Sequence, residues 1–378
     1  MNIAKNVVER AGDTIVQREL AAPDTPVLLM VSGGSDSTAL AYIACELRER
    51  GVVGPVGIVH VNHNLRGEAS DGDAAFTQEL AEALGVPMFS YDVDVERIVS
   101  ESGDNLEAVA RRERYSAAED ALAKLCQRAG EPVSHGRIFT AHTRNDRVEN
   151  FYMRSIVGTG PGGFRSMLYL NGSVARPLLD IDRDELRDYL RRRALDAEAD
   201  PNVACIRDAL GNLWREDATN AHTDQFRGFV RNEIVPLALS RNPRLLETLC
   251  RTMNLIADED DMLESQAQDL VRRTVRWLDG GDAKTLGDPS AGCVLKPAFG
   301  KEPLPLQRRA VFAVLERILG FDARVETRSI DAALAAFADG KPRGGYTANI
   351  QGDLALSANK QGLRIEPMQA YRARRNRL

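Results

Sequence analysis

The fold is decided by VLLMV, residues 27–31, and by the loop that follows it, SGGSDS, residues 32–37. The wholly apolar run predicts a buried strand, and a helix is expected from about Thr38. Two adjacent glycines let the backbone turn tightly and approach an anion, at which the free N–H groups of the helix would point. The hydroxyls of Ser32 and Ser37 add donors. The stretch therefore predicts a phosphate site at the carboxyl end of the first strand of an open sheet.

Apolar, strand-like runs alternate with helical periodicity on both sides of this loop. Further strands are expected at 56–61, 87–95 and 137–142, and helices at 3–16, 72–84, 106–125 and 146–157. Such alternation is typical of a parallel sheet that helices cover on both faces. The predicted fold class is therefore α/β, with a Rossmann-like parallel sheet up to about residue 157.

The sequence changes character after residue 157. A helix is expected to start near Asp182, where Glu185 could close a capping box. The later expectations are an inserted loop at 196–213, helical periodicity at 225–278, a linker at 278–292, helices at 304–319 and 329–338, and β-like runs at 345–351 and 354–366. We expect a catalytic domain at 1–220, a helical segment at 221–280 and a small α+β domain at 281–378.

The composition excludes several classes of protein. The 378 residues are 43% hydrophobic, but the longest apolar run, 332–338, is far shorter than the roughly 20 residues of a membrane helix. The sequence does not begin with a basic segment followed by an apolar one, so a cytoplasmic protein without a membrane partner is expected. The cysteines are widely spaced and form no C-x-x-C pair, which argues against disulfides and thiolate metal sites.

The net charge of −6 averages two unlike parts of the chain. Residues 1–220 contain 25 Lys and Arg against 35 Asp and Glu, whereas residues 221–378 contain 24 against 20. An acidic part suits Mg²⁺ and a cationic substrate, and a basic part suits an RNA backbone. The whole-chain charge therefore does not exclude a nucleic-acid partner.

The glycine loop resembles one particular class of phosphate loop. It contains no Lys, so it does not fit the G-x-x-x-x-G-K-[ST] pattern. It resembles instead the S-G-G-x-D-S loop of the PP-loop ATP pyrophosphatases, which adenylate a substrate oxygen and release pyrophosphate. The resemblance implies an ATP site, where Asp36 would hold Mg²⁺ against the phosphates. The residues expected to bind the nucleotide are Ser32, Gly33, Gly34, Ser35, Asp36 and Ser37, with His60 and Arg111 from later motifs.

Several motifs in order along the chain resemble those of tRNA(Ile)-lysidine synthases. They are HVNHNLRG at 60–67, LEAVARRERY at 106–115, TAH at 140–142 with Glu149, IVGTG at 156–160, RPL at 176–178 and WREDATN at 214–220. The resemblance implies that ATP adenylates the C2 oxygen of the wobble cytidine in a tRNA(Ile) with a CAU anticodon, with release of pyrophosphate. Free L-lysine would then displace AMP to give lysidine. The sequence does not give the oligomeric state, and a homodimer is one state that it allows.

Four side chains are expected to carry the chemistry. Asp146 and Glu149 share one face of a helix start and could hold Mg²⁺, bind the lysine ammonium or take its proton. Favourable charge at a helix N-terminus is the simpler alternative for both. His142 could stabilise charge on the α-phosphate or act as an acid. Asp36 completes the set and is the expected metal ligand together with Asp146.

Basic residues in three places are expected to contact tRNA. Arg114 lies one turn from Arg111, and its guanidinium suits phosphate oxygens. The other candidates are Arg227 and Arg231, in a segment that resembles the family's R-N-x-[IL]-R helix, and Lys341 and Arg343 in the basic C-terminal part. A solvated surface, and a disordered tail at 371–378, are the alternatives for the C-terminal residues.

Five positions depart from the family pattern: Thr143, Asn145, Arg147, Asn150 and Gly228. No role is assigned to Thr143 or Asn145 from the sequence. Two other functions stay open. One is PP-loop tRNA thiolation, which normally needs clustered cysteines that this chain lacks. The other is an inactive ATP- or RNA-binding module, which the departures would suit.

Overall fold

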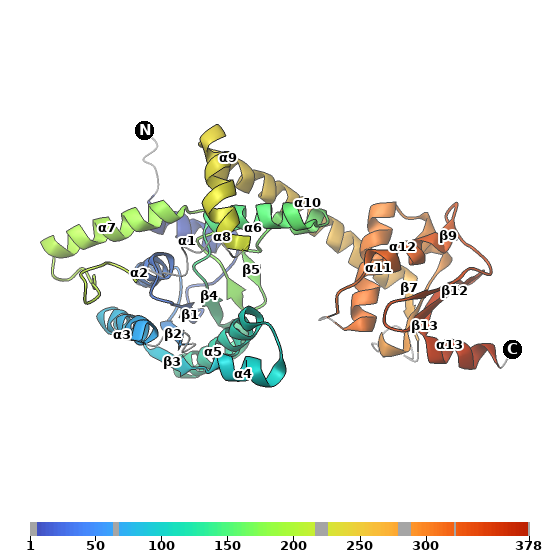
Figure 1. The fold of residues 1–378 in the computed structure, drawn as a ribbon, viewed down its shortest axis with the longest axis horizontal. Coiled ribbons are helices and arrows are strands. Elements are labelled where there is room, and N and C mark those ends of the chain that lie inside the picture. The colour runs from blue at the N-terminus through green and yellow to red at the C-terminus, as the bar shows by residue number, and fades with distance from the viewer. Residues whose placement is uncertain (1–5, 63–67, 216–225, 279–288, 321–322, 377–378) are drawn as a thin grey trace. The chain divides into compact units, whose positions relative to one another are not determined.

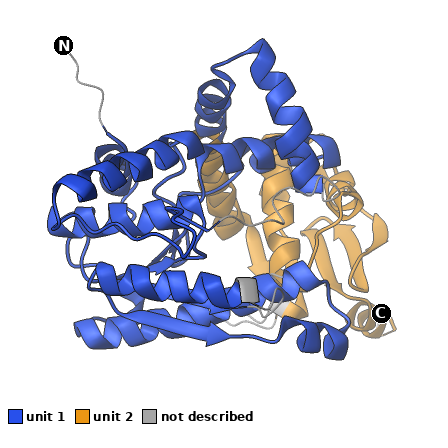
Figure 2. Ribbon diagram, turned by 60° about the vertical axis from the view of Figure 1, so that its left-hand side comes forward, with its two compact units in different colours: residues 1–256 blue, residues 257–378 orange. Residues whose placement is uncertain are grey.

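The computed structural model describes residues 6–62, 68–215, 226–278, 289–320 and 323–376 (Figure 1). The chain forms two compact units, residues 1–256 and residues 257–378 (Figure 2). The predicted boundaries at residues 220 and 280 are not tested by this division and stay predictions. In the described ranges, no helix combines the length and the apolar character that crossing a membrane requires.

The first unit is built around a six-stranded sheet in the order β3-β2-β1-β4-β6-β5. All neighbours are parallel except the β5–β6 hairpin. The strands are β1 Val27–Met30, β2 Val56–Asn62, β3 Met88–Asp92, β4 Arg137–Phe139, β5 Leu170–Asn171 and β6 Val174–Ala175. The strand order reverses between β1 and β4, so ligands are expected at the carboxyl ends of these two strands.

Helices cover both faces of this sheet (Figure 1), which confirms the predicted α/β class. Successive residues of β1 point to opposite faces: Leu29 packs in the core with α1, α2 and α7, and Leu28 packs in the core with α5. The helices are α1 Val7–Gln17, α2 Ser35–Glu49, α3 Glu68–Ala83, α4 Val95–Ser102, α5 Leu106–Ala129, α6 Arg144–Val157 and α7 Arg183–Ala199. The predicted capping box of Asp182 and Glu185 is confirmed at the start of α7.

In the residues that the structure describes after 225, helical segments follow the part of the chain around the sheet. They are α8 Phe226–Phe229, the π-helical η4 Val230–Ile234, α9 Val235–Arg241 and α10 Leu245–Thr274. Pro236 has no N–H to donate, and the hydrogen-bond ladder widens to a π turn just before it. A small core with Val148, Val230 and Met253 packs α6 against these segments. The arrangement places Arg227 and Arg231 beside the first turn of α6.

The second unit packs helices on a five-stranded sheet in the order β11-β12-β13-β8-β7. All neighbours in this sheet are antiparallel. Its core contains Leu270, Phe299 and Ile365. The elements are β7 Val275–Trp277, β8 Cys293–Leu295, α11 Leu304–Leu319, α12 Thr327–Ala335, β11 Thr347–Ile350, β12 Leu354–Asn359, β13 Gly362–Pro367 and α13 Met368–Arg375, with the two-residue strands β9 Phe337–Ala338 and β10 Lys341–Pro342.

The structure corrects several expected elements. Periodicity at 225–278 predicts continuous helix, but a turn at 242–244 interrupts it and residues 275–277 pair with β8. The run at 354–366 forms two strands because a turn at Lys360 and Gln361 reverses the chain. Residues 371–375 of the expected tail belong to the helix α13, whose Arg374 donates to buried Glu366, and residues 377–378 lie outside the described residues. Residues 279–288 of the expected linker lie outside the described residues.

Candidate functional site

The phosphate loop joins β1 to α2 at the predicted place. Gly33 adopts a φ of +89°, which a residue with a side chain rarely adopts. Gly34 is the N-cap of α2 and has no side chain to cap it, so the first N–H groups of the helix are open to an anion. Ser37 donates to the Gly34 carbonyl at 3.1 Å, and its Oγ lies 3.2 Å from that of Ser32. The loop therefore has the donors and the backbone shape of an anion site.

A segment distant in sequence braces this loop. The N–H of Arg215 donates to the Gly33 carbonyl at 2.9 Å. Its side chain extends from there to Asp73 of α3, at 2.9 Å, and to Asp208, at 3.3 Å. A Cβ added to Gly33 would lie 3.2 Å from the Arg215 side chain. Arg215 thus fixes the loop from the side, a role that its place in WREDATN did not reveal.

Residues 196–213, which are expected from the sequence to form an inserted loop, have a structural role. This segment packs on α2, where the N–H of Ile206 donates to the Tyr42 hydroxyl at 3.0 Å. Arg193 of α7 donates to the Ala204 carbonyl at 2.7 Å. The helix α7 extends to Ala199, and the irregular chain after it leads back to the phosphate loop. The predicted insert is therefore the route by which Arg215 reaches Gly33.

Three carboxylates from two elements meet three arginines beside the loop. The carboxylates are Asp36 of α2 and Asp146 and Glu149 of α6, and all three side chains are largely buried. Arg183 donates to Asp36 at 2.9 Å and to Asp146 at 3.1 Å, and lies 3.6 Å from Glu149. Sequence reasoning placed the carboxylates together at this edge but did not identify Arg183. A positive side chain at the first residue of α7 opposes the helix dipole, which was the available signal.

Arg227 and Arg231 contact the same carboxylates. Arg227 donates to Asp146 at 2.8 Å and to Glu149 at 2.9 Å. Arg231 donates through two nitrogens to Glu149, at 2.7 and 3.0 Å. Their spacing by one helical turn explains how both reach one carboxylate. The structure therefore places these two guanidinium groups within the acidic cluster.

Burial and charge act in opposite directions on the carboxylates. Burial raises the pKa of Asp36 above its ordinary value, and Arg183 only partly offsets this. Burial would also raise the pKa of Asp146, but the charges of Arg183 and Arg227 outweigh it and lower the pKa. Burial would lower the pKa of Arg183, yet Asp146 and Asp36 raise it. Asp146 is therefore the firmly ionised member of the pair, and Asp36 depends more on its partner.

His142 follows β4 and lies beside this cluster. Burial, assisted by the charges of Arg176, Arg227 and Arg111, lowers its pKa to about 4 against the opposing charge of Asp146. The imidazole is therefore uncharged at neutral pH. Its Nδ1 lies 2.9 Å from the Thr140 hydroxyl. In this state the ring suits hydrogen bonding to a phosphate or a base better than ion pairing.

Three of the positions that depart from the family pattern, Thr143, Asn145 and Arg147, have structural partners. The Thr143 hydroxyl and N–H both donate to Asp146, at 2.9 and 2.8 Å, and complete the N-terminal capping box of α6. The side-chain carbonyl of Asn145 accepts from the N–H of Arg183 at 2.9 Å. Arg147 is 1% exposed and donates to Tyr169, Asp180 and Asn254. Thr143 thus orients Asp146 directly, and Asn145 holds the backbone of Arg183 beside the acidic cluster.

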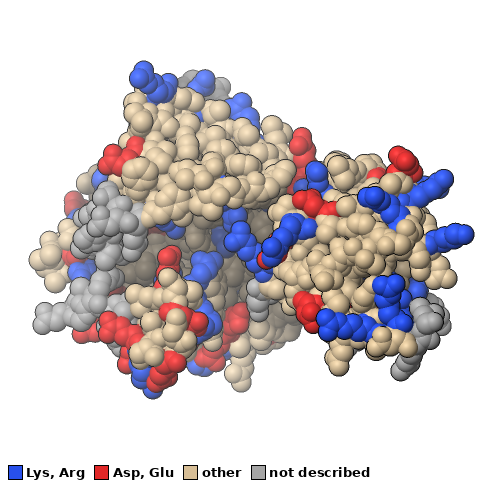
Figure 3. Space-filling view, turned by 45° about the vertical axis from the view of Figure 1, so that its right-hand side comes forward, with Lys and Arg blue, Asp and Glu red and all other residues tan. Residues whose placement is uncertain are grey.

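The remaining predicted residues lie in different surroundings. His60 is buried, and its Nδ1 lies 2.9 Å from the Val31 carbonyl, behind the loop. His63 lies outside the described residues. Arg111 and Arg114 are exposed on α5, with the Arg111 guanidinium 5.0 Å from the Tyr115 ring. Lys341 and Arg343 belong to the second unit, where Figure 3 shows basic side chains spread over the visible face with some acidic ones among them.

The donor chemistry of the cluster fits a nucleotide-bound Mg²⁺. That ion is usually held by one or two carboxylates and the substrate phosphates, and Asp36 and Asp146 lie close enough for one guanidinium to bridge them. Among the described residues, no group of three or more His, Cys, Asp or Glu could form a self-contained metal site. Four of the cysteines are buried and the fifth, Cys205, is partly buried.

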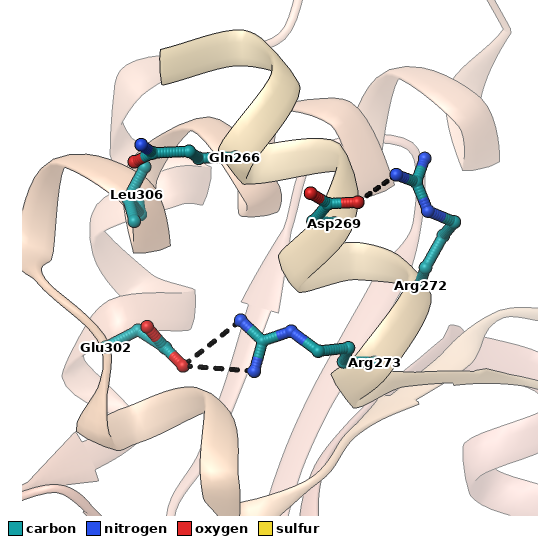
Figure 4. A pocket seen from close by; sticks show the side chains of 6 residues that line it. All are labelled: Gln266, Asp269, Arg272, Arg273, Glu302 and Leu306. Atoms are coloured by element: carbon teal, nitrogen blue, oxygen red, sulfur yellow. Dashed lines mark hydrogen bonds and ion pairs between the residues drawn. The ribbon is translucent and has the colours of Figure 1, made fainter. Parts of the chain in front are cut away.

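A hollow in the second unit lacks these properties. It is lined by Gln266, Asp269, Arg272, Arg273, Glu302 and Leu306 (Figure 4). Its charges are paired within the wall: Arg272 with Asp269, and Arg273 with Glu302 at 3.4 Å. Because these charged side chains already neutralise one another, the site at β1 and β4 remains the candidate.

Comparison with known proteins agrees with this location. A model of the PP-loop domain matches residues 5–209. The tRNA(Ile)-lysidine synthase of Thermus thermophilus is 36% identical over 303 residues, covering 79% of this chain and 50% of that protein, and the one of Geobacter sulfurreducens is 30% identical over 312 residues, covering 82% and 59%. A solved U34-tRNA thiolase from Methanococcus maripaludis has 16% identity and a TM-score of 0.46, over 67% of this chain and 78% of its own.

The chain spans about half the length of the Thermus thermophilus relative. The match to the PP-loop domain covers more than half of the chain. It includes the phosphate loop, β4 and the turn of α6 that carries Asp146 and Glu149. The predicted family is confirmed by this match: the chain belongs to the PP-loop family.

Proposed function

We propose that the protein ligates free L-lysine to C2 of the wobble cytidine in a tRNA(Ile) with a CAU anticodon, using ATP. The observation that carries the proposal is the meeting of Asp36, from the phosphate loop, with Asp146 and Glu149 at one edge of the sheet. The names of the relatives, tRNA(Ile)-lysidine synthases, supply the reaction.

In the first step the C2 oxygen of cytidine attacks the α-phosphorus of ATP, and pyrophosphate leaves. The first N–H groups of α2 and the hydroxyls of Ser32 and Ser37 are suited to hold the phosphates. Mg²⁺ bound by Asp36 and Asp146 would neutralise phosphate charge. His142, uncharged at neutral pH, is suited to donate a hydrogen bond to a phosphate oxygen.

In the second step the ε-amino group of lysine attacks C2, and AMP leaves with the oxygen. The ammonium must lose a proton before it attacks, and the amine loses a second when the carbon–nitrogen bond has formed. The pair of Asp146 and Glu149 is suited to attract the ammonium and accept a proton. Arg227 and Arg231 hold these carboxylates, so we assign them to orienting the pair, whereas Arg114, Lys341 and Arg343 are proposed to contact tRNA phosphates.

The test is transfer of labelled lysine to a tRNA(Ile) transcript in the presence of ATP and Mg²⁺. We expect lysine to enter acid-insoluble RNA, with one AMP and one pyrophosphate formed for each lysine. A CAU-anticodon tRNA(Met) transcript serves as the substrate control. Folded protein that transfers no lysine under these conditions would refute the proposal.

A further inference from the structure

Arg183 occupies the space between the two proposed metal ligands. We infer that Arg183 is a positioning residue that stands in for the divalent cation: it holds Asp36 and Asp146 together in the free protein and yields Asp36 when Mg²⁺ binds. The inference rests on the proposed nucleotide site. It goes beyond the family assignment because it concerns what the side chains do before a nucleotide arrives.

The contacts give Arg183 the position of a bridging cation. Its Nε donates to Asp36 Oδ2 at 2.9 Å, and its Nη2 donates to Asp146 Oδ1 at 3.1 Å. The exposed fractions of the three side chains are 18%, 19% and 9%, so water screens the charges only in part. Without a positive group between them, two carboxylates this close would repel each other.

Hydrogen bonds hold the backbone of Arg183, and this orients its side chain toward Asp36 and Asp146. Its N–H donates to the Asn145 side chain at 2.9 Å, which ties the start of α7 to the start of α6. The N-cap residue before it, Asp182, contacts Arg144 at 3.1 Å and forms the capping box with Glu185. The helix dipole disfavours a positive charge here, so the carboxylates must supply the stabilisation.

The two carboxylates depend on Arg183 to different degrees. Asp146 also accepts from Arg227, at 2.8 Å, and from the N–H and hydroxyl of Thr143. Asp36 accepts from Arg183 at 2.9 Å and from the Ser35 hydroxyl at 3.0 Å. Removal of Arg183 therefore leaves Asp146 supported but Asp36 without a positive partner among the described contacts. Asp36 is the ligand over which the arginine and a metal ion compete.

This competition predicts an unusual result: removing a positive residue should improve cation binding. We expect the Arg183→Gln protein, without nucleotide, to bind Mn²⁺ about tenfold or more tightly than the wild type, because the competing charge has gone. Its Tm in EDTA should be lower than that of the wild type and should recover when Mg²⁺ is added. Electron paramagnetic resonance measures free Mn²⁺, and differential scanning calorimetry measures Tm.

Arg191→Gln is the matched control. Arg191 lies on the same helix, α7, but pairs with Asp188 at 2.7 Å on an exposed part of the helix rather than with Asp36 or Asp146. It should leave Mn²⁺ affinity unchanged. Arg183→Lys, which keeps a charge but not the two-pronged contact, should fall between wild type and Gln.

Unchanged or weaker Mn²⁺ binding by folded Arg183→Gln, confirmed by circular dichroism, would overturn the inference. If Arg183→Gln does not fold, the Lys variant decides the matter in the same way: tighter binding supports competition, and equal or weaker binding refutes it. Lysine transfer by the wild type is measured separately, so its failure would defeat the proposed function while leaving the Mn²⁺ comparison interpretable.

Discussion

Two buried glutamates in this molecule, one in each unit, are paired with two arginines in nearly the same way. Glu149 accepts from Arg231 at 2.7 Å and from Arg227 at 2.9 Å. Glu366 accepts from Arg374 at 2.6 Å and from Arg364 at 2.8 Å. Their side chains are 3% and 1% exposed. Paired burial alone therefore does not distinguish a functional carboxylate from a structural one.

The two glutamates differ in which other residues their arginines contact. Glu149 shares its arginines with Asp146, and a third arginine connects both to Asp36 in the phosphate loop. Glu366 instead fastens α13 to the sheet of the second unit, where Arg374 also reaches Ser357. Concentrating three carboxylates beside an anion site gains nothing for folding, because removal of water from charges costs free energy. We therefore read the first cluster as chemical and the second as structural.

The largest effect is expected from a substitution in the first cluster, which is formed by Asp36, Asp146 and Glu149. Asp146→Asn keeps the side-chain shape but removes the charge that Arg183 and Arg227 contact. We expect lysine transfer to fall by about 1000-fold or more, because both the proposed metal site and the proton acceptor are impaired. Single-turnover transfer of labelled lysine measures this, with circular dichroism as the check on folding. Transfer at the wild-type rate would show that the chemistry lies elsewhere.

The matched change in the second cluster should affect stability instead. Glu366→Gln leaves Arg364 and Arg374 without their buried anion, and loss of one partner of such a set costs about 3 kcal/mol in the free energy of unfolding. Urea unfolding followed by circular dichroism measures it. Binding of ATP should stay at the wild-type level. A fall in ATP affinity comparable to the loss of stability would erase the contrast between the clusters.

A smaller effect is expected from substitution of Arg215, which holds the phosphate loop in place. Arg215→Ala removes the side-chain contacts to Asp73 and Asp208 but keeps the backbone bond to Gly33. Loosening a preorganised loop should raise the KM for ATP about tenfold with a lesser change in kcat. Arg207→Ala, which removes a contact to Glu198 in the same segment, is the control and should leave KM unaltered.

The pH dependence of stability tests the surroundings of His142. Its pKa is lowered from 6.5 to about 4, so the native state disfavours the protonated ring. The associated stability is fully present above pH 6.5 and is lost as the pH falls toward 4. In His142→Gln this part of the slope should disappear from denaturant midpoints measured between pH 4 and 7. An identical slope in both proteins would contradict the assignment.

The smallest effect is expected from the exposed arginines of α13. Arg374 holds the buried Glu366, whereas Arg372 and Arg375 are exposed. We therefore expect the double variant Arg372→Ala with Arg375→Ala to bind tRNA more weakly without losing stability. The decrease should be a few-fold and larger at low salt than at high salt. Filter binding at two ionic strengths measures it. An equal decrease at both would remove the electrostatic explanation.

The sequence allows β1 to β4, most helices of the first unit and the capping box at Asp182 to be predicted, because these depend on local periodicity and capping chemistry. It does not reveal short strands such as β5, β6 and β8. It also brings Asp36 near Asp146, since both follow neighbouring parallel strands. The contact of Arg183 with Asp36 joins residues 147 positions apart and follows from no local rule. The same holds for the ion pairs of Arg227 and Arg231 with Glu149, while the expected contact of these arginines with tRNA stays a prediction.

One helical turn of α6 has a consequence for how changes spread through the first unit. Asp146 and Glu149 face the nucleotide site, while Arg147 between them is anchored to Tyr169, Asp180 and Asn254 of α10. The turn that carries the two carboxylates is thus connected to this part of α10 through a single buried side chain. We therefore expect a substitution at Asn254 to be felt at Asp146 and Glu149, although Asn254 contacts neither of them.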